Sequence, residues 1–206
     1  TLRVPHLSGT IVLDSDTDDP GWTSPSGPAR TGAFAGDDGL AARPYSDARL
    51  VWGDGHLYLA LYAADEDIES TPDEPGRPVG LGDSFRLAFF REDDGEQLWI
   101  DVSPTGSVSG SRRPRSAPAD LTWRSGAHVS QEIDGTLNDA TDDDEEWVIE
   151  MAVPFESLGM SGRVGESIGF AVSRCDKPKN EERRCAGWGD WDPRHGRAGS
   201  RLVLGR

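Results

Sequence analysis

An all-β fold is predicted, an antiparallel β-sandwich of jelly-roll type that forms a single domain over residues 1–206. Short runs in which apolar and polar residues alternate recur along the chain, and clusters of Gly, Pro, Asp, Asn and Ser separate them. Such runs are typical of strands joined by tight turns, and many of them at this spacing favour a sandwich. No segment longer than one or two turns has helical periodicity, and no long linker divides the chain.

Several segments are expected to form the strands, and one turn of helix is expected after Pro154, where Gly159 is a typical stop signal. The strand segments are residues 9–14, 48–53, 56–64, 84–90, 96–103, 127–133, 146–154, 167–174 and 200–205. Most of them alternate, which predicts that each strand directs one row of side chains to the core and the other row away from it.

The register of one hairpin can be predicted from its turn, centred on Asp93 and Asp94. On the core face the pairs are Phe89 with Leu98, Leu87 with Ile100, and Phe85 with Val102. On the other face they are Arg86 with Asp101, Ala88 with Trp99, and Phe90 with Gln97. A Trp surrounded by Gln, Asp and Arg suits the apolar side and the hydroxyls of a pyranose. Alternatively this face is covered, and the Arg and Asp form a structural ion pair.

The charge of the chain excludes some partners. A formal net charge of -16 without a cluster of Lys and Arg argues against nucleic acid. No apolar stretch is long enough to span a membrane. The chain begins at Thr1 rather than Met, so an export signal is presumed to have been removed and a secreted, periplasmic or cell-surface location is expected.

The two cysteines, Cys175 and Cys185, flank a short polar loop. They are either free thiols or a disulfide, since the loop between them offers no further ligand at zinc spacing. We favour the disulfide, which would stabilise the fold by about 2 to 3 kcal/mol and which indicates export.

Several motifs together resemble the family 9 carbohydrate-binding modules and their bacterial relatives. In chain order they are "IVLDSDTDDPGW", "ARLVWGDGHLYLALYAADEDI", "GDSFRLAFF", "QLWIDVSPTGSV", "DGTLNDATDDDEEWVIEMAVPFESLG" and "GWGDWDPRHG" before "SRLVLG". The resemblance spans nearly the whole chain. It implies a non-catalytic β-sandwich, often stabilised by calcium, whose best known members hold the end of a sugar chain between two tryptophans.

Only some of the family's ligand-binding positions match this sequence. The first tryptophan of the family is missing, since Gly80, Leu81 and Gly82 stand before Asp83. The family has an acidic residue at the position of Arg86, and of its Gln, Arg and Asn strand only the Gln matches. Its second tryptophan corresponds to Trp188, with Trp191 nearby. The candidate ligand-binding residues are therefore Trp188, Trp191, Trp99, Gln97, Asp101 and Arg86.

Two acidic runs are candidates for calcium, which takes about six to eight oxygen ligands from irregular loops. The candidate ligands are Asp142 and Asp144 in one run, and Asp14 and Asp16 in the other. The alternative for the first run, which is the usual explanation of such a charge run, is a solvated approach to a strand. The second run lacks the Gly and the Glu of an EF-hand loop.

No motif indicates catalysis. The chain has no nucleophile elbow, no zinc-protease helix motif and no phosphate-binding glycine loop. We therefore predict a non-enzymatic module that binds a saccharide end or short glycan. The alternative is a structural or protein-interaction sandwich without sugar affinity, with calcium as a stabilising ion.

Overall fold

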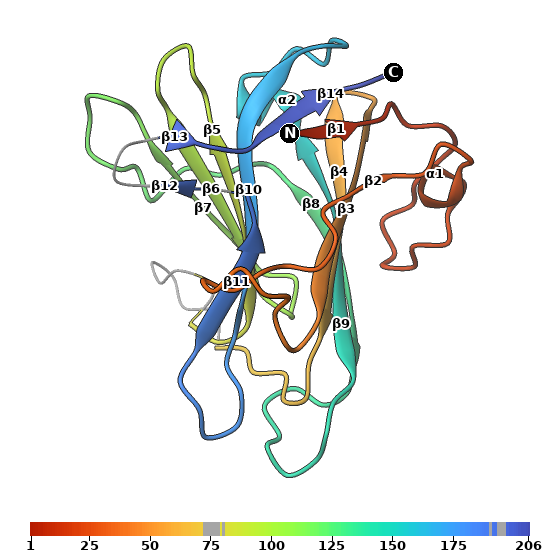
Figure 1. Ribbon diagram of the computed structural model, residues 1–206, viewed down its shortest axis with the longest axis vertical. Coiled ribbons are helices and arrows are strands. Elements are labelled where there is room, and N and C mark those ends of the chain that lie inside the picture. Colours follow the sequence, from red (N-terminus) through yellow and green to blue (C-terminus); the bar gives the residue numbers. More distant parts are fainter. Residues whose placement is uncertain (72–78, 80, 190, 193–196) are drawn as a thin grey trace.

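Two β-sheets face each other and form a sandwich (Figure 1). The computed structural model describes residues 1–71, 79, 81–189, 191–192 and 197–206, and of residues 191–192 and 197–198 it describes the backbone alone. No helix in these residues is long and apolar enough to cross a membrane. The predicted all-β sandwich is confirmed.

The first sheet has the strand order β1-β14-β10-β5-β6-β7, and β11 pairs with the free half of β10. All its pairs are antiparallel except β1 with β14. The strands are β1 (Leu2–Val4), β14 (Arg201–Leu204), β10 (Ser167–Asp176), β5 (Ser84–Phe90), β6 (Gln97–Val102), β7 (Val108–Arg113) and β11 (Arg184–Trp188).

The second sheet has the order β2-β3-β4-β9-β8 and is antiparallel throughout. Its strands are β2 (Ala29–Arg30), β3 (Ser46–Gly53), β4 (His56–Ala64), β9 (Glu146–Pro154) and β8 (His128–Asp134). A two-stranded ribbon, β12 (Trp191–Asp192) with β13 (Arg197–Ala198), and two short helices, α1 (Pro20–Thr23) and α2 (Phe155–Leu158), complete the described elements.

The core lies between the two sheets, where alternate side chains of both meet. Phe85 of β5 and Trp147 of β9 are fully buried, and their ring centroids are 4.8 Å apart. Each buried large apolar side chain contributes about 1.5 to 3 kcal/mol through the hydrophobic effect. The alternation that fills this core also directs the intervening residues of β5 and β6 away from the second sheet.

The predicted strands from residue 48 onward are confirmed, with ends shifted by no more than two residues. The hairpin register is confirmed at all six pairs. The helical turn after Pro154 is confirmed as well, and Gly159 ends it in the left-handed conformation, at φ 67°. Positive φ is accessible to Gly at little cost, which explains its place there.

The predicted strand at residues 9–14 is wrong. Its backbone bonds locally instead: the amide of Val12 donates to Asp19 Oδ2, and the carbonyl of Thr10 accepts from Gly21. Ile11 packs beside Trp22 on the outside of the second sheet. The segment therefore covers a sheet face rather than extending an edge.

Candidate functional site

One face of the first sheet points away from the core and is mostly polar. We call it the polar face; it consists of the outward side chains of β10, β5, β6 and β7. The core residues Phe85, Leu87 and Phe89 alternate with Arg86 and Ala88, which face outward. Their neighbours on the polar face are Phe90, Gln97, Trp99, Asp101, Ser109, Ser111, Arg113, Ala171 and Ser173.

A two-point ion pair crosses the polar face. Arg86 donates from Nε to Asp101 Oδ1 at 2.6 Å and from Nη2 to Oδ2 at 3.0 Å. The hydrogen bond that Arg86 donates to Asp101 raises the pKa of Arg86. The Arg86 side chain stays 55% exposed, whereas that of Asp101 is 13% exposed. The structural ion pair is therefore present, and its arginine is still accessible from solvent.

Trp99 is half-buried beside this pair. The guanidinium carbon of Arg113 lies 5.8 Å from the centre of its ring, near the outer limit of a cation–π contact. Gln97 is 7% exposed, and its Oε1 accepts no hydrogen bond in the part of the chain that the structure describes. Buried acceptors normally have a donor, so this oxygen is suited to a water molecule or a ligand hydroxyl.

A further arginine lies at the end of the polar face. Arg183 donates from Nε to the carbonyl of Gly82 and from Nη2 to Ser84 Oγ, both at 2.9 Å. Burial lowers the pKa of the Arg183 guanidinium. The positive charge of Arg86 lowers this pKa further, which indicates that Arg86 is near enough to repel it. The sequence prediction missed Arg183 and Arg113, because it recognised neither β7 nor the hairpin that leads into β11.

The C-terminal ribbon lies over the same side of the sheet. Figure 1 shows β12 and β13 on the side of the first sheet that faces away from the second, and β13 contacts β5 and β10. Trp191 is part of β12, so its backbone lies on this side; its side chain is outside the described residues.

The structure places Trp188 elsewhere. Trp188 pairs with Val172, which is a core residue, and its ring centroid lies 6.1 Å from that of Phe170 inside the sandwich. Trp99 pairs with Ala88 on the opposite face. Trp188 and Trp99 therefore do not form one site, because the β10–β11 register turns Trp188 toward the core.

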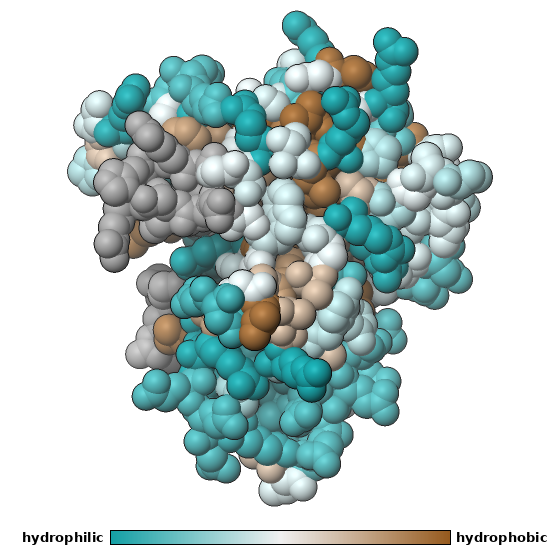
Figure 2. Space-filling model, in the orientation of Figure 1, coloured by the Kyte–Doolittle hydropathy of each residue, from teal (hydrophilic) through white to brown (hydrophobic). Residues whose placement is uncertain are grey.

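The predicted calcium ligands Asp142 and Asp144 lie in the β8–β9 loop, where Asp144 closes a turn. Asp144 is 7% exposed and accepts the backbone amides of Ile68 and Thr136, both at 2.6 Å. Asp142 accepts the hydroxyl of Thr136. The acidic run is therefore in part a structural turn, and its end of the molecule is covered by hydrophilic residues (Figure 2).

Asp14 and Asp16 also form a turn, in which Asp14 Oδ1 accepts the amide of Asp16 at 3.0 Å. Neighbouring amides and the indole of Trp22 donate to Glu150, which is fully buried. The turn at Asp14 and Asp16 contacts β9 through Glu150. Asp142 and Asp144 instead bind Thr136 and Ile68. The four residues do not form a single cluster.

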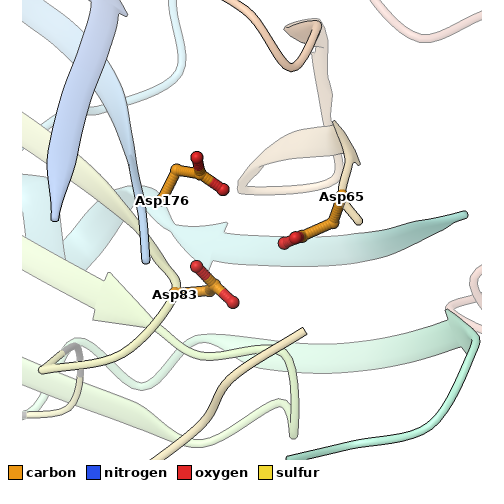
Figure 3. A group of neighbouring side chains, drawn as sticks. All are labelled: Asp65, Asp83 and Asp176. Carbon is orange, nitrogen blue, oxygen red and sulfur yellow. The ribbon is translucent and has the colours of Figure 1, made fainter. Parts of the chain in front are cut away.

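A different group of carboxylates does converge. Asp65, Asp83 and Asp176 are buried, and one oxygen of each lies within 4.8 Å of the others (Figure 3). They come from the end of β4, the start of β5 and the end of β10. We call them the buried acidic cluster. The sequence prediction missed it, because the three residues stand far apart in the chain and share no local pattern.

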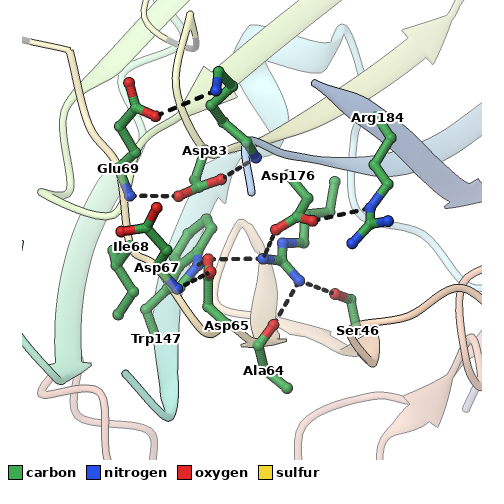
Figure 4. A network of polar contacts seen from close by, with 12 residues as sticks. Ser46, Ala64, Asp65, Asp67, Ile68, Glu69, Asp83, Trp147, Asp176 and Arg184 are labelled. Carbon is green, nitrogen blue, oxygen red and sulfur yellow. Dashed lines mark hydrogen bonds and ion pairs between the residues drawn. The ribbon is translucent and has the colours of Figure 1, made fainter. Parts of the chain in front are cut away.

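Two arginines hold the cluster (Figure 4). Arg174 Nη2 donates to Asp65 Oδ2 and to Asp176 Oδ1, both at 2.7 Å, and Arg184 Nε donates to Asp176 Oδ2 at 3.2 Å. Trp147 Nε1 also donates to Asp65 Oδ2, at 3.0 Å. Arg174 is only 3% exposed, so its charge is compensated almost entirely by these carboxylates.

Asp83 has no guanidinium partner in the described residues. Its two oxygens accept the backbone amides of Glu69 at 2.6 Å and Lys177 at 2.7 Å. Burial, together with the charge of Asp65, raises the pKa of Asp83 to about 8. With Asp83 protonated at neutral pH, two carboxylates face two guanidinium groups.

This arrangement bears on calcium. Carboxylate oxygens are suitable calcium ligands. However, Arg174 Nη2 occupies the position between Asp65 and Asp176, where an ion would have to bind both. The cluster as it stands therefore does not fit calcium, and Arg174 supplies the positive charge in its place. A cavity of about 590 Å³, lined in part by Asp65 and Asp176, adjoins the cluster.

Comparison with known proteins identifies relatives by structure only. No family model matches the sequence, and no curated protein matches it. A family 9 carbohydrate-binding module from Caldicellulosiruptor kristjanssonii in complex with cellotriose is similar over 99% of this chain and 94% of its own, with a TM-score of 0.65 and 14% identity. The same kind of module in complex with glucose has a TM-score of 0.63 and 15% identity, over 99% and 96% of the two chains.

A protein from Bacteroides uniformis to which carbohydrate binding has been attributed is also similar. It has a TM-score of 0.67 and 10% identity, and the match covers 99% of this chain and 100% of the other. The chain thus has the fold of the family 9 carbohydrate-binding modules.

Proposed function

We propose that this domain binds a saccharide end or short glycan, without catalysis, through the polar face of the first sheet. The observation that supports this best is the grouping on one face of the half-buried Trp99, the Arg86–Asp101 pair and Gln97, whose Oε1 has no donor among the described residues. An aromatic plane and oriented polar groups together are what a pyranose requires.

The ion pair is suited to a binding role. Because Arg86 is held at two points by Asp101, its orientation is set before a ligand arrives, which lowers the entropy cost of binding. The neighbouring residues Ala88 and Ala171 are buried, at 4% and 7% exposure, so the part of the face that a ligand can reach lies at Trp99 and Arg86.

The composition of the polar face supports a non-catalytic role. Among the side chains that the described strands β10, β5, β6 and β7 direct to this face, Asp101 is the only carboxylate. Hydrolysis of a glycosidic bond usually requires two carboxyl groups on opposite sides of that bond. The known complexes of structurally similar modules, with cellotriose and with glucose, favour binding as well.

We also propose that the protein is exported. The Cys175–Cys185 disulfide is formed in the structure, between directly opposite residues of β10 and β11. Disulfides persist mainly in oxidising compartments, which supports a secreted, periplasmic or cell-surface location.

A saccharide titration tests the proposed function. Tryptophan fluorescence and calorimetry with mono- and oligosaccharides should show saturable binding, and Trp99→Ala should weaken it at least tenfold. Tyr45→Ala is the matched control, since Tyr45 is an exposed aromatic residue away from the polar face and should not affect affinity. Absence of binding across a broad panel would favour the structural or protein-interaction alternative.

A further inference from the structure

We infer that the polar face selects a saccharide that carries a carboxylate, a uronate, over a neutral one. This inference rests on the proposed function and adds the chemical class of its ligand. It follows from the distribution of charge on the polar face and from the donors that remain available there.

The charge on the polar face is opposite to that of the whole chain. The chain has a formal net charge of -16, yet among the side chains that the structure describes on or at the end of this face, Arg86, Arg113 and Arg183 stand against the carboxylate of Asp101. These described groups, three guanidinium groups and one carboxylate, carry an excess of positive charge. On an acidic protein, such a local excess is a feature that an anionic ligand would match.

Arg86 has a donor to offer. Its Nε and Nη2 are bound to Asp101, and Nη1 has no hydrogen-bond partner among the described residues. Because the side chain is 55% exposed, this nitrogen can reach a ligand without breaking the ion pair. Guanidinium groups bind carboxylates strongly through charge-assisted hydrogen bonds.

Arg183 strengthens the case through its position. It is bonded to Ser84, which lies two residues before Arg86 on the same face of β5. The charge of Arg86 lowers the pKa of Arg183, so the two like charges repel each other, and an anion bound between them would reduce this repulsion.

Trp99 and Arg113 complete the match. Trp99 lies on the row next to Arg86, and Arg113 lies beside the Trp99 ring. A uronate has an apolar ring side for the indole and, on the same ring, a carboxylate for a neighbouring guanidinium. A neutral sugar would use only the first of these contacts.

The test compares uronate and neutral oligosaccharides of equal length, a trigalacturonate and a triglucuronate against cellotriose, by calorimetry at low and high salt. We expect the uronates to bind at least tenfold more tightly, and we expect added salt to weaken their binding alone. Arg113→Gln should reduce uronate affinity about tenfold and neutral affinity by much less, since it removes the charge and leaves the Arg86–Asp101 pair intact.

Arg49→Gln is the control, because Arg49 faces outward from the second sheet, where it donates to Thr17. Equal or tighter binding of cellotriose would overturn the uronate inference and leave the proposed function standing. Uronate binding that Arg49→Gln weakens and Arg113→Gln does not would also overturn it. If no saccharide binds, the proposed function and the inference both fail.

Discussion

The two arginine–aspartate sites of the first sheet use the same chemistry in opposite surroundings. On the polar face, Arg86 binds Asp101 at two points and remains 55% exposed. In the buried acidic cluster, Arg174 bridges Asp65 and Asp176 and is 3% exposed. Solvent screens the first pair and leaves its arginine accessible, whereas the second is isolated from solvent and its charges must balance internally. Burial, rather than residue type, separates the arginine that we propose to bind the ligand from the structural one.

The largest difference between the two sites should appear when each arginine is removed. Arg174→Met would leave Asp65 and Asp176 with less compensation in the interior, and breaking a buried pair typically costs about 3 to 5 kcal/mol. Urea unfolding should show this loss, and an Arg49→Met control should stay within about 1 kcal/mol of wild type. A loss below about 1 kcal/mol for Arg174→Met would contradict the comparison.

The buried acidic cluster should also make stability depend on pH through Asp83. Its pKa is raised to about 8 in the folded protein from an ordinary 3.8, so the folded state binds this proton more tightly than the unfolded state. The resulting stabilisation is complete below about pH 4, declines as the pH rises, and is absent above about pH 8.

Urea unfolding at pH 5, 7 and 9 measures this effect. The free energy of unfolding of wild type should fall relative to that of Asp83→Asn as the pH rises, because Asn mimics the protonated acid and does not titrate. Asp93→Asn, with a side chain that is 75% exposed, is the control and should leave the pH profile unchanged. A difference between wild type and Asp83→Asn that does not change with pH would show that Asp83 stays ionised when folded.

On the polar face, removal of the arginine should destabilise the fold less. Arg86→Met leaves the carboxylate of Asp101, which is 13% exposed, without its partner, and because Arg86 itself is 55% exposed, solvent screening should limit the loss to about 1 to 2 kcal/mol. The substitution should also weaken saccharide binding in a calorimetric titration. A stability loss as large as that of Arg174→Met would show that Arg86 is as important to the fold as the buried Arg174.

The smallest expected effect is that of calcium. Because Arg174 supplies positive charge to the buried acidic cluster, the melting temperature at pH 7 should differ by less than about 2 °C between excess calcium and a chelator. A stabilisation of 1 kcal/mol would shift it by about 2 to 4 °C in a domain of this size. A large increase with calcium would contradict the role given to Arg174. It would then favour the predicted loop ligands, or the buried acidic cluster with Arg174 displaced.

The parts of the site that could be predicted depend on neighbouring residues in the chain, and the parts that could not depend on contacts between distant segments. The hairpin register and the outward direction of Arg86, Trp99 and Asp101 follow from alternation within one short segment, and they are confirmed. The place of Trp188 depends on its pairing with β10, and the alternation within its own short segment does not reveal that register. The mistaken strand at 9–14 has strand-like residues, but its partners are a turn and a helix.

The sequence by itself determined the fold class, most strands and one complete hairpin, because side-chain alternation and turn residues act over a few neighbouring positions. Only the tertiary structure decided which polar residues meet. Asp65, Asp83, Arg174 and Asp176 lie on three strands and have no local pattern, and their burial and balance of charge exist only after the two sheets pack. The same packing turned Trp188 inward and brought Arg113 and Arg183 to the polar face.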